Sequence, residues 1–178
     1  MFKRLVIFFL IMGCQEFNMP KQKAYLAHKF DTPSYEFFSN DCYGFNINSD
    51  SKTNLSSECN IIISYKLLKA DIFISNINIE DNIELIKSDF DKKITDNSRN
   101  ISEISASEFN NHKTKVYGTY YSFIGNAPSN IQFYITDSIS NFITGSVYFK
   151  TKPNYDSLLP SISYVKNDIK KIFETFQW

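Results

Sequence analysis

The chain has 178 residues, of which 43% are hydrophobic and 16% aromatic, a composition that allows one well-packed core. Lysine plus arginine and aspartate plus glutamate each number 19, so the formal net charge is zero. This balance argues against nucleic acid, and against any strongly charged surface, as the partner.

The start of the chain resembles a bacterial lipoprotein signal. Two basic residues precede the apolar run Leu5–Met12, which is too short to cross a bilayer because a spanning helix needs roughly 20 apolar residues. The run ends in a small residue and a cysteine, Gly13 and Cys14, as a lipobox does. We therefore predict a signal peptide over residues 1–13 and lipidation of Cys14. An ordinary secretory signal with an incidental cysteine is the alternative.

Residues 14–23 are polar and indicate a short lipidated tether. A single domain is predicted over residues 24–178, because no repeat, low-complexity tract or interior linker divides this part of the sequence. A short tether would keep that domain close to its membrane.

The first half of the domain predicts short strands. Residues 23–27 form a candidate first strand, and a loop-rich stretch with Pro33 and several aromatic residues follows. Residues 60–65 and 68–74 are strand-like. In the second of these, the even-numbered residues are apolar and share one face by period-two alternation.

The pattern then changes to that of a helix. Apolar residues at spacings of three and four run from Ile79 to Ile94, with acidic residues early and Lys92 and Lys93 late, which favours the helix dipole. Beyond this helix, links too short for crossover helices predict an antiparallel meander. Its strands are expected at residues 104–109, 114–124, 131–136 and 142–150.

The C-terminal segment carries a second apolar stripe at helical spacing. Pro160 suits its first turn, Asp156 or Ser157 could cap it, and Lys170 and Glu174 are spaced as an ion pair. We therefore expect an α+β fold, in which two helices cover a curved antiparallel sheet. By analogy, this order of elements is similar to the PsbP/Mog1 type of sandwich.

Two cysteines remain once Cys14 is assigned to lipid. In an oxidising compartment, Cys42 and Cys59 predict a disulfide, because they are a lone pair separated by a short loop. A metal site is the alternative, but the two histidines, His28 and His112, lie in unrelated segments. We expect neither a metal nor a cofactor.

Several segments stand in an order that resembles one known family. In the second half these are Val116-Tyr117-Gly118, Gly125-Asn126-Ala127, Gln132 to Ser138, Phe142 to Phe149 and Pro153 to Ser157, followed by Tyr164 to Ile169 and a final Trp178. Together with the lipobox, this set is similar to GldD, the gliding motility lipoprotein family of Bacteroidota. The resemblance covers nearly the whole mature chain and is weakest from about Ser49 to Asn111.

The resemblance implies a lipoprotein required for gliding and for the coupled type IX secretion system. It implies a lipid-anchored position in the cell envelope, facing the periplasm, with other proteins of that machinery as partners. It implies no catalytic residues, because no reaction is assigned to the family.

Sequence motifs of common enzymes are absent from the chain. It has no G-x-S-x-G elbow and no glycine-rich phosphate loop. Asp137 and Asp156 could pair as two acids, but aspartates at strand ends and helix starts usually form turns and caps. We expect His28 and His112 at the surface and predict a protein that is not an enzyme. A cryptic hydrolase would need one of these histidines in a cleft beside a nucleophile.

A set of polar and aromatic residues is the best candidate for contact with a partner. Tyrosine and asparagine at loop tips bury area and form hydrogen bonds with few torsions to freeze. The structural alternative is turn chemistry together with a tyrosine-rich sheet face covered by a helix. The set comprises Asn126, Ser129, Gln132, Tyr134, Tyr148, Asn154 and Tyr155.

The sequence is therefore compatible with two functions. The first is a membrane-anchored, non-enzymatic component that assembles or stabilises the gliding and secretion machinery. The second is an envelope lipoprotein that uses its aromatic residues to bind a small apolar ligand between sheet and helix.

Overall fold

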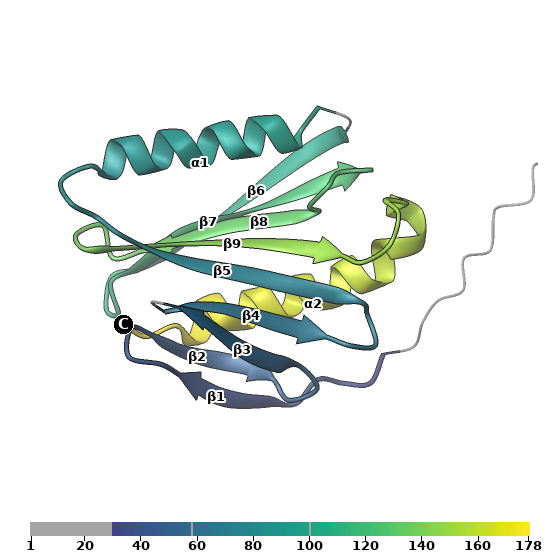
Figure 1. Cartoon of the computed structure of the whole chain (residues 1–178), viewed down its shortest axis with the longest axis horizontal. Coiled ribbons are helices and arrows are strands. Elements are labelled where there is room, and N and C mark those ends of the chain that lie inside the picture. The colour runs from purple at the N-terminus through teal and green to yellow at the C-terminus, as the bar shows by residue number, and fades with distance from the viewer. Residues whose placement is uncertain (1–29, 58, 100) are drawn as a thin grey trace, which may run out of the picture.

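A seven-stranded antiparallel sheet forms the centre of the computed structural model, which describes residues 30–57, 59–99 and 101–178 (Figure 1). The strand order is β3-β4-β5-β9-β8-β7-β6, and a separate pair, β1-β2, lies beside it. The strands are β1 (Tyr35–Ser39), β2 (Gly44–Asn48), β3 (Lys52–Ser57), β4 (Asn60–Tyr65), β5 (Ala70–Asn78), β6 (Ile101–Asn111), β7 (Val116–Gly125), β8 (Ile131–Thr136) and β9 (Asn141–Phe149).

The predicted meander is confirmed as β6-β7-β8-β9, with every neighbouring pair antiparallel. β5 joins the meander by pairing along β9, from Ala70 opposite Phe149 to Asn78 opposite Asn141. This pairing sets the two ends of the sheet. The β4–β5 turn lies at one end and the β8–β9 turn at the other, because β5 and β9 run in opposite directions.

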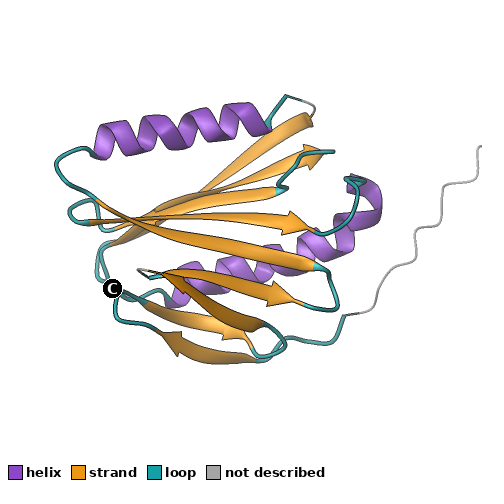
Figure 2. Ribbon diagram, viewed as in Figure 1, coloured by secondary structure: helices purple, strands orange, loops and turns teal. Residues whose placement is uncertain are grey.

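Helices α1 (Ile83–Asn97) and α2 (Tyr155–Thr175) cover opposite faces of the sheet (Figure 2). Adjacent residues of β8 demonstrate this, since successive side chains of a strand point to opposite faces. The Phe133 ring packs against Phe173 of α2 at 5.7 Å between centroids, whereas the Tyr134 ring packs against Phe90 of α1 at 5.3 Å. The expected α+β fold, a sheet covered by two helices, is confirmed.

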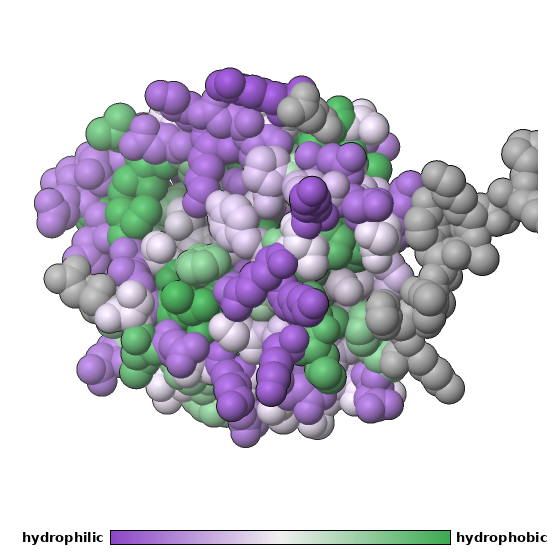
Figure 3. All heavy atoms as spheres, turned by 45° about the vertical axis from the view of Figure 1, so that its right-hand side comes forward, coloured by the Kyte–Doolittle hydropathy of each residue, from purple (hydrophilic) through white to green (hydrophobic). Residues whose placement is uncertain are grey.

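The larger core lies between α2 and the sheet. Phe133 is fully buried there, and its ring covers Gly145 on the neighbouring strand. A Cβ atom at position 145 would lie only 2.0 Å from that ring, so the residue has to be glycine for the aromatic layer to form. On the side drawn in Figure 3, hydrophobic residues reach the surface in separate patches among hydrophilic ones.

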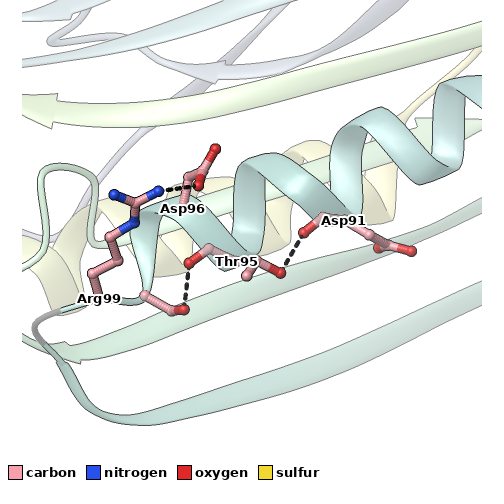
Figure 4. Close-up of polar contacts among 5 residues, drawn as sticks. Asp91, Thr95, Asp96 and Arg99 are labelled. Atoms are coloured by element: carbon pink, nitrogen blue, oxygen red, sulfur yellow. Dashed lines mark hydrogen bonds and ion pairs between the residues drawn. The ribbon is translucent and has the colours of Figure 1, made fainter.

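α1 differs in its bounds from the predicted helix. It begins at Ile83, so Ile79 belongs to the link before it, and it continues to Asn97, so its last turn contains no basic residue. The predicted stripe is confirmed where it matters for packing, because Ile86, Phe90 and Ile94 are buried. Polar side chains close the end of the helix (Figure 4): Thr95 donates to the Asp91 carbonyl, and Arg99 forms an ion pair with Asp96.

α2 starts earlier than predicted. Asn154 caps it by accepting a hydrogen bond from the Ser157 N–H, which leaves Pro160 inside the helix rather than in its first turn. The expected pair of Lys170 with Glu174 was also wrong. Glu174 instead lies 3.5 Å from the Nζ of Lys171.

The β1–β2 hairpin and β3 are strands where a loop-rich stretch was predicted. β1 is an exposed edge strand without a period-two pattern, so its sequence carries no strand signal. β2 is almost wholly buried because Phe45 and its neighbours pack on α2. The predicted strand at residues 23–27, Cys14 and the tether lie outside the described residues.

A buried carboxylate fastens the hairpin to α2. Asp168 is only 2% exposed, because it lies in the helix stripe that faces the core. Tyr35 of β1 donates to its Oδ1 at 2.7 Å, and Asn48 of β2 donates to its Oδ2 at 2.9 Å. Tyr65 of β4 is a third partner. Burial raises the pKa of Asp168, and these hydrogen bonds oppose the rise only in part.

The predicted disulfide between Cys42 and Cys59 is present, with 6.0 Å between the two Cα atoms. It joins the β1–β2 turn to the β3–β4 turn and therefore links the small sheet to an edge of the large one. The Tyr43 hydroxyl donates to the Cys59 carbonyl across the same junction.

Removing the disulfide is expected to lower thermal stability. On the chain-entropy model, a loop of 17 residues corresponds to about 3 kcal/mol of unfolding free energy. Cys42→Ser should therefore lower the Tm by roughly 10 °C. The measurement is thermal unfolding under non-reducing conditions, with Cys42→Ser/Cys59→Ser as a control for thiol cross-linking. A melting curve unchanged from that of the native chain would contradict the prediction.

Asp168→Ala should destabilise the domain by about 3 kcal/mol, because it leaves the buried donors of Tyr35, Tyr65 and Asn48 without their acceptor. Urea unfolding measures this cost, and Asn167→Ala on the exposed side of α2 is the matched control.

The cost of Asp168→Ala should also depend on pH. The folded pKa of Asp168 lies above its ordinary value of 3.8, so its contribution to stability is fully present below that value. The contribution is lost as the pH rises through the folded pKa. The difference in unfolding free energy between the native chain and Asp168→Ala should therefore shrink from pH 4 upwards, and a difference that grows would contradict the assignment.

Candidate contact surface

The residues predicted to contact a partner occupy two places in the structure. Asn126, Asn154 and Tyr155 meet at the end of the molecule where β7 ends and α2 begins. Gln132, Tyr134 and Tyr148 lie on the sheet face that carries α1, because β8 and β9 present them on the same side. Ser129 lies between these places, in the β7–β8 turn.

The first place is a cleft of about 400 Å³. Asn126 is part of its wall and also holds α2 in position, since its side-chain oxygen accepts a hydrogen bond of 2.9 Å from the Tyr155 N–H. The cleft is lined by Ser102, Ile124, Gly125, Asn126, Asn154, Tyr155 and Asp156.

The turn beside this cleft is held by several hydrogen bonds. The Asn97 side chain, from α1, donates to the Ser129 carbonyl at 2.7 Å and accepts from the Ser129 N–H at 3.1 Å. Asn130 donates to the carbonyls of Phe123 and Gly125. Ser129 is itself buried, so its role is turn chemistry, as in the structural alternative. The turn beside the cleft is therefore held in one conformation before any partner binds.

The cleft presents neutral hydrogen-bonding groups together with one carboxylate, that of Asp156. Burial raises the pKa of Tyr155, and the charges of Asp156 and Glu103 raise it further, so the phenol stays protonated at neutral pH. Within residues 30–57, 59–99 and 101–178, no three His, Cys, Asp or Glu side chains gather closely enough to hold a metal ion.

Gln132 and Tyr134 form the floor beneath α1. Gln132 is buried, and the Tyr134 ring is enclosed by Phe90 and by a stacked contact with Phe142 at 5.1 Å. Both residues therefore match the alternative of a sheet face covered by a helix. Their sequence pattern alone could not distinguish a covered face from an open one.

Tyr148 lies beyond the edge of α1, where the same face is open. It is 38% exposed, and its ring meets that of Phe73, which is 41% exposed, in an edge-to-face contact at 5.7 Å. Ile77 lies farther along β5 on the same face, beyond the exposed Ser75, and the half-buried Ile62 is the neighbour of Phe73 on β4. We call Ile62, Phe73, Ile77 and Tyr148 the open strip.

Polar atoms without hydrogen-bond partners lie directly beside the open strip. Ser146 lies opposite Phe73 on the neighbouring strand, and Gln132 lies opposite Ser146 on the next one. Among the described residues, neither Ser146 Oγ nor Gln132 Oε1 has a hydrogen-bond partner. Asp71, which lies opposite Tyr148, uses one carboxylate oxygen for an ion pair of 2.8 Å with Lys150, and its other oxygen has no hydrogen-bond partner within the described part of the chain. Such buried groups are uncommon, since each costs about 1–3 kcal/mol.

Phe73 was missed by the sequence analysis, although the signal was present. The alternation in residues 68–74 placed the even-numbered side chains on one face, and the structure confirms that Ala70, Ile72 and Ile74 are buried there. An aromatic residue at an odd position must then lie on the opposite face. Asp168 was also missed, although its place in the apolar stripe between Val165 and Ile172 was a signal that its carboxylate is buried.

One of the two histidines, His112, lies within the described residues. His112 is exposed in the turn between β6 and β7, where its ring meets Tyr117 at 5.6 Å between centroids. His28 lies outside the described residues. No helix of the described ranges is long and apolar enough to cross a membrane.

The chain matches a known protein family. No curated protein is significantly similar to this chain. A family model described as gliding motility lipoprotein GldD matches residues 15–178, which is nearly the whole chain and includes both the cleft and the open strip. The chain therefore belongs to the GldD family of gliding motility lipoproteins.

Proposed function

We propose that this lipoprotein is a non-enzymatic subunit that assembles or stabilises the gliding motility and type IX secretion machinery. Its membership of a gliding motility lipoprotein family supports the process. The single observation that carries the proposed mode of action is the open strip, in which the exposed rings of Phe73 and Tyr148 lie together on the uncovered part of the sheet.

The open strip has the properties of a protein contact. Exposed aromatic residues are enriched in the energetically important parts of interfaces, and here two of them already pack on each other. They project from β5 and β9, which are central strands paired on both sides. A partner would therefore meet side chains that are already ordered, and the entropy lost on binding would be small.

The cleft supplies a second, polar contact in this proposal. Asn126, Asn154 and Tyr155 present amide and phenol groups from a turn that is already held in place. Neutral groups of this kind add hydrogen bonds at the edge of an interface without the desolvation cost of buried charges.

Anchorage through Cys14 is the third part of the proposal. Gly13 and Cys14 follow an apolar run of signal length, and the family model begins at residue 15, directly after this cysteine. Acyl chains at Cys14 would hold the domain at the membrane surface, facing the periplasm.

The aromatic residues expected to line a ligand site pack on one another instead. Phe173 of α2 contacts Phe109, Tyr120 and Phe133, with centroid distances between 5.7 and 5.9 Å. The aromatic content is therefore used for the core between α2 and the sheet. For this reason we favour the assembly role over the binding of a small apolar ligand.

Disrupting the open strip should release partner proteins. Phe73→Ala/Tyr148→Ala removes both exposed rings while leaving the buried core intact, so recovery of other gliding proteins in detergent-solubilised affinity purification should fall severalfold. Ile104→Ala/Ile139→Ala is the matched control, since these residues are similarly exposed and lie outside the strip. Equal losses for both pairs, or no loss for the strip variant, would count against the proposal.

Cys14→Ala should abolish lipid attachment, because it removes the thiol that would be acylated, and should leave a chain that still folds, because the predicted domain begins at residue 24. Incorporation of labelled palmitate in living cells measures this, with Cys42→Ser as the control that keeps its label. Palmitate retained by the Cys14 variant would show that the anchor was assigned to the wrong residue.

A further inference from the structure

The first described residues enter the domain at a defined end of the sheet. Phe30 packs on Tyr164 of α2 with 4.9 Å between ring centroids, and it shares a groove with Leu67 and Leu68 of the β4–β5 turn. In Figure 1 the described chain likewise begins beside this turn. Sixteen residue steps separate Phe30 from Cys14, so this end lies within about 55 Å of the proposed anchor.

The β4–β5 turn projects an apolar side chain from this end. Leu67 is 89% exposed, the most exposed large hydrophobic residue in the described ranges, whereas Leu68 beside it is buried. The turn is held rigidly, because Lys69 adopts a left-handed backbone conformation and its carbonyl accepts a hydrogen bond of 2.7 Å from the Lys150 N–H. Leu67 therefore points outward as a consequence of the fold.

Lysines surround this leucine. Lys66 and Lys69 flank it in the turn, and Lys150 and Lys152 lie on the adjoining link between β9 and α2. All four are exposed. Asp71 offsets one of them through its ion pair with Lys150, and Asp31 and Asp50 line the groove beside the turn, so the excess of positive charge belongs to the tip itself.

A protruding leucine between lysines fits a phospholipid surface. The ammonium groups can meet headgroup phosphates while the leucine enters the boundary of the acyl chains. The energetically important residues of protein interfaces are enriched in Trp, Tyr and Arg and poor in Leu, and residues 66–69 contain none of the enriched types. Tethering also raises the local concentration of lipid to the millimolar range, so that a weak contact becomes populated.

The turn at the opposite end has different chemistry. Ile139 is 65% exposed in the β8–β9 turn, but its neighbours are Ser138 and Ser140, and Asp137 closes the turn. Burial acts to raise the pKa of Asp137, but N–H groups of the turn bind its carboxylate and hold that pKa below its usual range, so the turn stays anionic at neutral pH. The anionic headgroups of a membrane would therefore repel this turn.

We propose that the Lys66–Lys69 tip rests on the phospholipid surface that holds Cys14, and so sets the orientation of the domain. The orientation rests on the anchorage given above as part of the proposed function. It would direct the cleft toward the membrane, at the same end as the tip, and hold the open strip along the side of the molecule.

Spin labelling of the full lipidated chain in vesicles tests this orientation. Leu67→Cys provides a single reactive thiol, because Cys14 carries lipid and Cys42 is bonded to Cys59. In phosphatidylglycerol–phosphatidylethanolamine vesicles, a nitroxide at position 67 should collide severalfold more with oxygen than with a water-soluble nickel chelate. A nitroxide at Ile139→Cys should show the reverse. Equal access of the nickel chelate to both positions would overturn the proposal.

Charge reversal separates lipid contact from other causes. Adding Lys66→Glu/Lys69→Glu to the labelled chain should return the nitroxide to water, while Lys113→Glu in the turn between β6 and β7 should not. Flotation of the same vesicles tests the anchor independently. Protein that does not float would defeat the proposed anchorage, whereas protein that floats with its tip in water would defeat only the orientation. A tip that is shielded in native membranes but not in lipid vesicles would indicate a protein contact and would also overturn the proposal.

Discussion

The packing of α2 against the sheet and the β1–β2 hairpin is the constraint on which the rest of the structure depends. The helix offers one apolar stripe, yet it serves two neighbours at once, with Phe173 facing the strands and Asp168 facing the hairpin. The stripe is continuous with Phe176, whose ring packs against those of Tyr43 and Phe45, and these two rings also stack on each other. A backbone bridge between Gly44 and Gln177 then fastens the segment after the helix to β2.

This arrangement determines which surface is left uncovered. Since α2 and the hairpin together occupy one face, α1 is the remaining element that can cover the other, and its contacts run over β7, β8 and the beginning of β9. β4, β5 and the end of β9 are left open on that face. The open strip is thus a consequence of one helix being too small for the sheet face it covers, and a surface of this kind is what an assembly component needs.

The two ends of the sheet have different chemistry. One end contains Phe30, where the described chain begins, together with the lysine-flanked tip and the cleft before α2. The other end holds the disulfide and Trp178, whose indole N–H donates to the Lys115 carbonyl at 2.9 Å. A lipid anchor at Cys14 would therefore place the tip and cleft near the membrane and the cross-linked end away from it.

The sequence by itself determined the local features of this protein. The meander, both helices, the cysteine pair and the family resemblance follow from periodicity, turn residues and short motifs, all of which are local in the chain. Strand β8 was predicted with its observed bounds, residues 131–136, because its apolar run ends at clear turns. Tertiary structure alone decided that β1 is a strand, since its order comes from docking and not from its own pattern. It also decided which tyrosines are covered. Tyr134 and Tyr148 lie on the same face of neighbouring strands, but the position of α1, set by contacts distant in sequence, leaves Tyr134 half-buried under Phe90 and Tyr148 exposed.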